Sequence, residues 1–238
     1  MHPDLSNILF LDIETVACTD DYSKLNERMK TQWARKSSFF KREETQTDED
    51  MFHLRAGIYA EFGKIIAIAI GKYHEPSPGK LGIKIRCIYS DDEKKVLNDF
   101  KHVLEKTDQN STKLCAHNGK EFDFPYLSRR MLVNSIGLPS ALNLSGKKSW
   151  EVPHLDTMEM WKFGDYKHYT SLDLLAAIFN IPTSKTEMDG SMVNHVYYTE
   201  RNLEKIANYC KGDVVAVAQL YLRLKGFDIV SEDFIVEG

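Results

Sequence analysis

The chain has 238 residues, of which 42% are hydrophobic and 11% aromatic, and its formal net charge is −4. This composition can build a sizeable core in one large or two small domains, and it excludes a chain that is disordered throughout. The acidic balance also excludes a protein that coats polyanions without selectivity. Any nucleic-acid contact must therefore come from local basic patches.

The sequence carries no signal for membrane insertion or cysteine chemistry. The longest apolar run, residues 65–70, is far too short to cross a bilayer, and no lysine or arginine precedes Lys24, unlike in a secretory signal. The four cysteines are scattered without a Cys-x-x-Cys pair, which favours reduced thiols over a zinc site. We therefore expect a soluble, cytoplasmic protein with no membrane contact.

The first predicted element is a strand over residues 8–15, an apolar run that is too short for a helix and typical of a buried central strand. Asp12 and Glu14 lie near its end. Because side chains alternate along a strand, the two acids point the same way with Cα atoms roughly 7 Å apart, so both can reach one cation. Alternatively, the strand has ended and the acids are solvated. Further inward-facing carboxylates would decide between these interpretations.

Residues 18–56 differ in character from the strands around them. Seven lysines and arginines fall between residues 24 and 42, where Glu27 is the only acid, and acids dominate residues 43–50. This pattern predicts a basic helical piece followed by an exposed loop. One hypothesis is that the insert is a substrate gate without an apolar face of its own. The alternatives are a solvated surface insert, or an insert that Trp33, Phe39 and Phe40 dock onto the domain.

Apolar periodicity and turn residues predict the other elements. Residues 65–70 form a buried strand, a turn follows at 75–79, and residues 83–89 form a half-exposed strand. Asp91 or Asp92 caps a helix with apolar positions over residues 96–104. The later predicted elements are a strand at 113–117, a helix at 125–133, an extended piece at 152–155 and helices at 171–179 and 200–224. No glycine-rich phosphate loop follows a strand, which argues against a nucleotide cofactor, and the order predicts an α/β fold around the first strand.

Two later segments supply further acids. Asp123 lies between phenylalanines just before a predicted helix, where it is either a site residue or an N-cap. Tyr209 and Asp213 are four residues apart and share one face of the last helix, at the edge of its apolar stripe. Together with Asp12 and Glu14, these carboxylates are hard oxygen ligands of the kind that magnesium and manganese prefer. Their number suits a two-metal site for phosphodiester cleavage.

Three motifs, in this order, resemble those of the DEDD proofreading exonucleases: Asp12-x-Glu14, Asn118-x-x-x-Phe122-Asp123 and Tyr209-x-x-x-Asp213. The tyrosine indicates the DEDDy branch, because the sister branch has a histidine where this chain has Asn208. Other stretches resemble a stand-alone subfamily related to the exonuclease domain of family-B DNA polymerases: Phe62-Gly63-Lys64-Ile65-Ile66, His154-Leu155-Asp156, Ser171-Leu172-Asp173-Leu174 and Asp189-Gly190-Ser191. The resemblance covers nearly the whole chain apart from the insert.

This resemblance implies a ribonuclease-H-like fold, with a mixed five-stranded sheet flanked by helices, in a single exonuclease domain over residues 1–238 with the charged insert at about 18–56. It implies metal-dependent 3′ to 5′ hydrolysis of single-stranded ends, with two Mg²⁺ or Mn²⁺ ions and release of nucleoside monophosphates. Asp12, Glu14 and Asp213 would hold the ion that activates water, and Asp12 would also bind the second ion. Asp123 would act there largely through water, and Tyr209 would orient the attacking water.

The resemblance also implies contacts to the substrate. Asn118 and the backbone around Thr15 would lie near the terminal nucleotide, and Phe122 or Phe124 either packs against its base or fills the core. We expect a DNA substrate and a role in DNA repair. The alternatives are an RNA 3′-end trimming exonuclease, a ribonuclease-H-like endonuclease and, from a different class, a catalytically inactive nucleic-acid-binding module. The last alternative predicts losses among the ligands, and all of them are present.

The remaining polar residues have less specific interpretations. We expect four histidines in the core or in loops because the site is complete without nitrogen ligands: His117, His154, His168 and His195. Asp156 is expected to be structural. Several basic and aromatic residues make either phosphate and stacking contacts or a solvated surface: Lys147, Lys148, Trp150, Lys162, Lys167 and Tyr169.

Overall fold

The computed structural model describes residues 2–108, 111–165, 169–183 and 188–238. The strands are β1 (Ile8–Ala17), β2 (Gly63–Ser77), β3 (Lys80–Tyr89), β4 (Lys113–Ala116), β5 (Leu155–Asp156) and β6 (Ile235–Glu237). The helices are α1 (Glu27–Ser37), α2 (Asp48–Arg55), α3 (Glu93–Glu105), α4 (Asp123–Val133), α5 (Thr157–Lys162), α6 (Leu172–Ile178), α7 (Val193–His195) and α8 (Leu203–Leu224). A π-helical segment, Val196–Glu200, connects α7 to the loop before α8.

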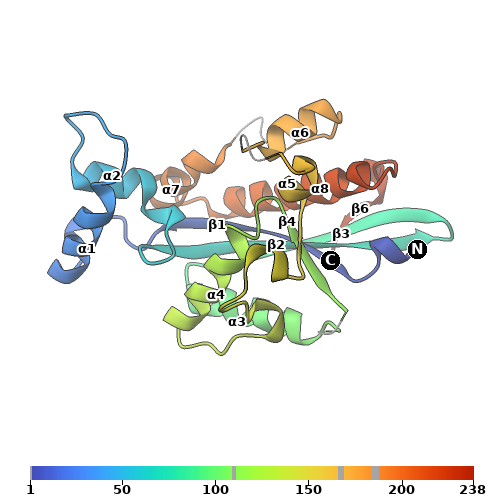
Figure 1. The fold of residues 1–238 in the computed structure, drawn as a ribbon, viewed down its shortest axis with the longest axis horizontal. Coiled ribbons are helices and arrows are strands. Elements are labelled where there is room, and N and C mark those ends of the chain that lie inside the picture. Colours follow the sequence, from blue (N-terminus) through green and yellow to red (C-terminus); the bar gives the residue numbers. More distant parts are fainter. Residues whose placement is uncertain (1, 109–110, 166–168, 184–187) are drawn as a thin grey trace.

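The described strands form one mixed sheet in the order β5-β4-β1-β2-β3-β6 (Figure 1). β1 is central, as predicted, and pairs antiparallel with β2 and parallel with β4. The sheet has six strands rather than the expected five, because residues Ile235–Glu237 add β6 alongside β3. Three residues are too few to show an alternating pattern in the sequence, so only the pairing reveals this strand.

Helices cover both faces of the sheet: α8 lies on one face, and α3 and α4 lie on the other (Figure 1). The alternation along β1 matches this arrangement, since Phe10 and Val16 pack on the α8 side and Leu11 and Ile13 on the opposite side. Asp12 has the same parity as Phe10 and therefore faces α8. The face that carries the acids is thus fixed by the apolar pattern of the strand itself.

A buried ion pair fixes the helices of the opposite face. Arg130 of α4 contacts Glu93 of α3 with its Nη2 atom 2.6 Å from Oε2, and it donates to the Ala60 carbonyl at 2.8 Å. Glu93 also accepts from the Ile65 backbone N–H at 2.8 Å. α3, α4 and β2 are therefore linked through one carboxylate. This network orients α4, whose first residue is Asp123.

The insert packs into a hydrophobic cluster that it shares with the rest of the domain. Trp33 of α1 is fully buried, donates from Nε1 to the Asp48 carbonyl at 2.7 Å, and packs edge-on against Phe62 at 4.9 Å. The expectation that the insert lacks an apolar face is therefore wrong. Phe40 also joins this cluster, whereas Phe39 is 89% exposed. Docking by aromatic residues is the alternative that the structure supports.

The acidic end of the insert is not a plain exposed loop either. Asp48–Arg55 form α2, which begins with a reciprocal capping box between Thr47 and Asp50. At one end of the molecule α1 and α2 pack beside β1, opposite the tip of the β2–β3 hairpin (Figure 1).

None of the helices in the described ranges combines the length and apolar composition that a membrane span requires.

Candidate active site

The two acids of β1 lie side by side on the α8 face. Glu14 is buried and Asp12 is half-buried, and a register shift between Glu14 and Thr15 follows them directly. The Cys210 thiol of α8 donates to Asp12 Oδ2 at 3.3 Å. Ligand atoms of Asp12, Glu14 and Cys210 all lie within 4.8 Å of one another. From the sequence, Cys210 was expected only to be a reduced thiol, and its helical position beside Tyr209 is the signal that could have placed it here.

α8 brings Tyr209 and Asp213 to the same place. They are one helical turn apart, and only 6% of Tyr209 and 8% of Asp213 is exposed. Burial raises the pKa of the Tyr209 hydroxyl, and the negative charges of Asp213, Glu14 and Asp12 raise it further. The hydroxyl is therefore protonated and can donate a hydrogen bond, including the one it shares with Asp213.

Asp123 is the first residue of α4 and does not cap the helix, because Phe122 occupies the N-cap position. Burial raises the pKa of Asp123 to about 7, backbone hydrogen bonds lower it, and the charge of Asp156 raises it. Its Oδ1 atom is buried and has no hydrogen-bond partner among the described residues. Asn118 Oδ1 is in the same situation. Buried oxygen atoms in this state are candidates for contact with a water molecule or a metal ion.

Asp156 has the structural role that was expected for it. Its carboxylate accepts from the backbone N–H groups of Asn118 at 3.0 Å, Lys120 at 3.1 Å and Met158 at 2.9 Å. Asn118 has a left-handed backbone with φ of 64°, which asparagine tolerates better than most residues. Asp156 therefore holds the turn that carries Asn118 and leads into Asp123.

The donor set fits divalent metal ions. The pKa of Asp12 is raised well above its usual range, first by burial and then by the charges of Glu14, Asp213 and Asp123. In the described part of the chain, no lysine or arginine forms an ion pair with Asp12 or Asp123. Carboxylates in this arrangement are costly without a counter-cation, and oxygen donors match magnesium and manganese.

Two of the predicted substrate residues, Thr15 and Phe122, directly neighbour Glu14 and Asp123 in the sequence. The Thr15 side chain hydrogen-bonds the Tyr126 hydroxyl, which also donates to the Gly57 carbonyl at 2.7 Å. Phe122 is half-buried with its ring 5.4 Å from that of Tyr126, so part of it is accessible. Phe124 is fully buried and belongs to the core. The contacts of Thr15, Asn118 and Phe122 with a nucleotide stay predictions.

Two of the histidines in the described ranges, His117 and His154, have both ring nitrogens in contact with protein groups. His117 contacts Thr157 Oγ1 at 2.9 Å and the Thr170 carbonyl at 2.8 Å, and His154 is buried against the Ala141 carbonyl at 2.6 Å. His195 is on the surface. His168 and Lys167 lie outside the described residues. The exposed residues Lys147, Lys148 and Trp150 form a separate surface feature, with the Lys148 ammonium 5.0 Å from the Trp150 ring.

Tyr169 is the exposed aromatic residue beside the acids. Its ring lies 6.3 Å from that of His117 in an edge-on arrangement, and 64% of the residue is exposed. Burial of its hydroxyl raises the pKa, and the charges of Asp123, Asp156, Asp12 and Asp213 raise it further. Tyr169 therefore lies within electrostatic reach of the carboxylates and presents a ring to solvent.

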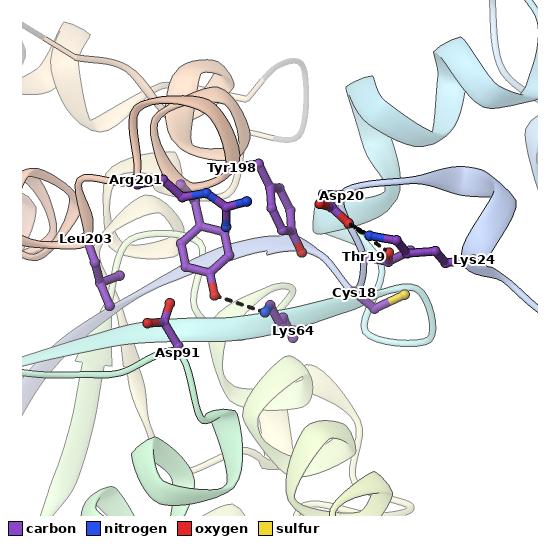
Figure 2. A pocket seen from close by; sticks show the side chains of 10 residues that line it. Cys18, Thr19, Asp20, Lys24, Lys64, Asp91, Tyr198, Arg201 and Leu203 are labelled. Carbon is purple, nitrogen blue, oxygen red and sulfur yellow. Dashed lines mark hydrogen bonds and ion pairs between the residues drawn. The ribbon is translucent and has the colours of Figure 1, made fainter.

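The segment before α8 is anchored to β1 around a pocket of about 450 Å³ (Figure 2). Tyr198 donates to the Ala17 carbonyl at 2.6 Å, and Asn194 accepts from the Ala17 backbone N–H at 3.0 Å. The Lys64 ammonium, in the pocket, contacts the Tyr197 hydroxyl at 3.0 Å. These contacts tie the π-helical segment to β1 and β2 and so fix where α8 begins. Sequence reasoning did not identify these positioning residues.

Comparison with known proteins agrees with this geometry. Residues 58–232 match the model of a family described as a predicted 3′-5′ exonuclease related to the exonuclease domain of PolB. The chain belongs to this family. The match includes Asp123, Tyr209 and Asp213, whereas Asp12 and Glu14 precede it, so it begins later than the resemblance suggested. No curated protein matches the chain.

The fold of this exonuclease-family chain is similar to part of a solved polymerase. The family B DNA polymerase from the hyperthermophilic archaeon Pyrobaculum calidifontis matches 92% of the chain with a TM-score of 0.58 and 14% sequence identity. The chain spans only 24% of that polymerase. At this identity the likeness shows the fold alone, and it confirms the expected ribonuclease-H-like α/β class.

Proposed function

We propose that the protein is a metal-dependent 3′ to 5′ exonuclease of the DEDDy type that releases nucleoside monophosphates from single-stranded ends, preferably of DNA. One observation carries this proposal: acids from β1, α4 and α8 converge, and the buried Asp123 Oδ1 atom has no partner among the described residues. Family membership supports the reaction class, and the relation to a DNA polymerase domain favours DNA and a role in DNA repair. All four cysteines are free, in keeping with a cytoplasmic setting.

The donors divide into two groups around the ions. Asp12, Glu14 and Asp213 would hold one Mg²⁺ or Mn²⁺ ion, and Asp12 would share a second ion with Asp123, which acts largely through water. When bound, the two ions supply an activated water and stabilise charge on the leaving oxygen. The protonated Tyr209 hydroxyl, which hydrogen-bonds Asp213, would orient the attacking water.

The surroundings of the acids suit a single strand. Phe122 offers a half-exposed ring, and Asn118 offers an amide oxygen without a protein partner among the described residues. Tyr169 adds an exposed ring on which a base can stack, a contact that tolerates any sequence. Together with the backbone at Thr15, these groups would position the terminal nucleotide within a single exonuclease domain over residues 1–238.

The test uses single strands of DNA and of RNA with a label at the 5′ end. We expect shortening by one nucleotide at a time from the 3′ end when Mg²⁺ or Mn²⁺ is added, faster on DNA, and no reaction in EDTA. Asp213→Asn, which keeps the shape of the side chain, is the inactive control. Internal cuts before any shortening, or full activity in EDTA, would contradict the proposal, and faster shortening of RNA would identify an RNA-trimming enzyme.

A further inference from the structure

A basic groove lies on the sheet face opposite α8 and the acids of β1. It has a volume of about 630 Å³ and runs between the β2–β3 pair and α3, with Leu9 and Ile70 at its floor. Both floor residues belong to the core on the α3 and α4 side. α8, which carries Asp213, lies on the other face with Asp12 and Glu14, and Asp123 does not line the groove. The groove is therefore separate from the candidate active site.

Four exposed cations line the groove: Lys72, Lys84, Arg86 and Lys106. Lys72 and Lys84 are directly opposite each other in the β2–β3 register. Arg86 is two residues beyond Lys84 and so shares its face. Like charges opposite each other destabilise a strand pair unless an anion lies nearby. The register therefore concentrates positive charge at a cost to the folded protein.

Few acids neutralise this charge. Among the residues that line the groove, the acidic side chain is that of Asp99, which already pairs with Lys95 at 2.7 Å. Among the described residues, no aspartate or glutamate forms an ion pair with any of the four cations of the groove. The chain as a whole carries a net charge of −4, whereas this groove is locally positive.

We propose that the groove binds backbone phosphates of a nucleic-acid strand, as a second contact remote from the hydrolysed end. A row of lysines and an arginine over an apolar floor suits a phosphodiester backbone, which is recognised without regard to sequence. The inference rests on the proposed function, because it assigns the same class of ligand to the opposite face. A strand must be long enough to pass around the edge of the sheet to occupy both sites, so the groove favours long substrates.

The test compares two double variants for binding of a long single strand in EDTA, where no hydrolysis is expected. Lys72→Gln/Lys84→Gln removes two groove cations, and Lys80→Gln/Lys94→Gln removes two exposed lysines outside the groove as a matched control. Each phosphate contact on a single strand contributes about 0.7 to the slope of log affinity against log salt. The slope of the groove variant should therefore be smaller in magnitude by about 1.4. If the variant and the wild-type protein bind equally well at 1 M salt, this difference makes the variant bind about 25-fold more weakly at 0.1 M salt.

Further measurements separate the two proposals. In Mg²⁺, the groove variant should shorten an oligonucleotide of a few nucleotides at the wild-type rate, and its melting temperature should not fall. A salt slope equal to that of the control would overturn the groove inference while leaving the exonuclease proposal intact. Displacement of the strand by polyglutamate as readily as by DNA of equal charge would also overturn it, in favour of an acidic protein partner. Failure of the wild-type protein to shorten any strand would instead contradict the proposed function.

Discussion

The Asp123→Asn substitution should stabilise the metal-free protein at high pH, although it removes a predicted metal ligand. Asparagine keeps the shape of the side chain and has no charge to bury. Asp123 is only 3% exposed, and its pKa is raised to about 7, mainly by burial. A carboxyl group with a raised pKa in the folded state holds its proton after the unfolded chain has lost it.

The sign and size of the effect follow from this difference. Below the unfolded pKa of about 3.9, both states are protonated and Asp123 costs nothing. As the pH rises from there to about 7, the folded state becomes progressively less stable relative to the unfolded state. At about 1.4 kcal/mol per pH unit, the cost is of the order of 1 to 2 kcal/mol at pH 5 and about 4 kcal/mol at pH 8. The variant escapes this cost.

Urea denaturation in EDTA at several pH values measures this difference. We expect the advantage of Asp123→Asn to grow from pH 5 to pH 8, whereas Asp233→Asn, at an exposed position, should show no such trend. Saturating Mg²⁺ should reverse the order, because an ion that binds only the folded wild-type protein stabilises it. The reasoning is refuted if the variant is no more stable than the wild type at pH 8, or if its advantage does not depend on pH.

Three further substitutions test other parts of the structure. Tyr209→Phe should preserve the fold and lower the single-turnover rate by ~10²- to 10⁴-fold, and an unchanged rate would make the tyrosine a packing residue. Trp33→Ala should lower the free energy of unfolding by about 3 to 5 kcal/mol, whereas Phe39→Ala at its exposed site should change it by less than ~0.5 kcal/mol. Arg130→Met leaves the buried Glu93 carboxylate without its guanidinium and should cost about 3 to 5 kcal/mol, measured by urea denaturation at pH 7.

The parts of the site that sequence reasoning could predict have local signals. The parity of β1 places Asp12 on the same face as Phe10, and the structure shows that this face is covered by α8. The four-residue spacing likewise places Tyr209 and Asp213 on one side of a helix. Each prediction needs only the period of its own element. The convergence of the acids from β1, α4 and α8 depends on tertiary packing, which the periodicity of single elements does not predict. The resemblance to the exonuclease motifs predicted this convergence.

The insert shows the opposite case. Trp33 and Phe52 are nineteen positions apart in sequence, and their rings pack edge-on at 5.3 Å only because α1 and α2 fold against each other. Neither helix has a long apolar stripe that reveals this contact. One local signal was present, since Thr47 and Asp50 have the spacing of a capping box and could have indicated the start of α2.

Asp156 both holds the turn that leads into Asp123 and adds to the cost of burying that acid. Its carboxylate is satisfied by backbone N–H groups on both sides of the site, which fixes the left-handed turn at Asn118. The same negative charge raises the pKa of Asp123. Replacing Asp156 by an uncharged residue would lower the pKa of Asp123, but it would also release the turn that carries Asn118 and leads into Asp123. The turn that brings Asp123 into the site is thus held by a second negative charge, that of Asp156. A bound cation would offset the negative charge of both carboxylates.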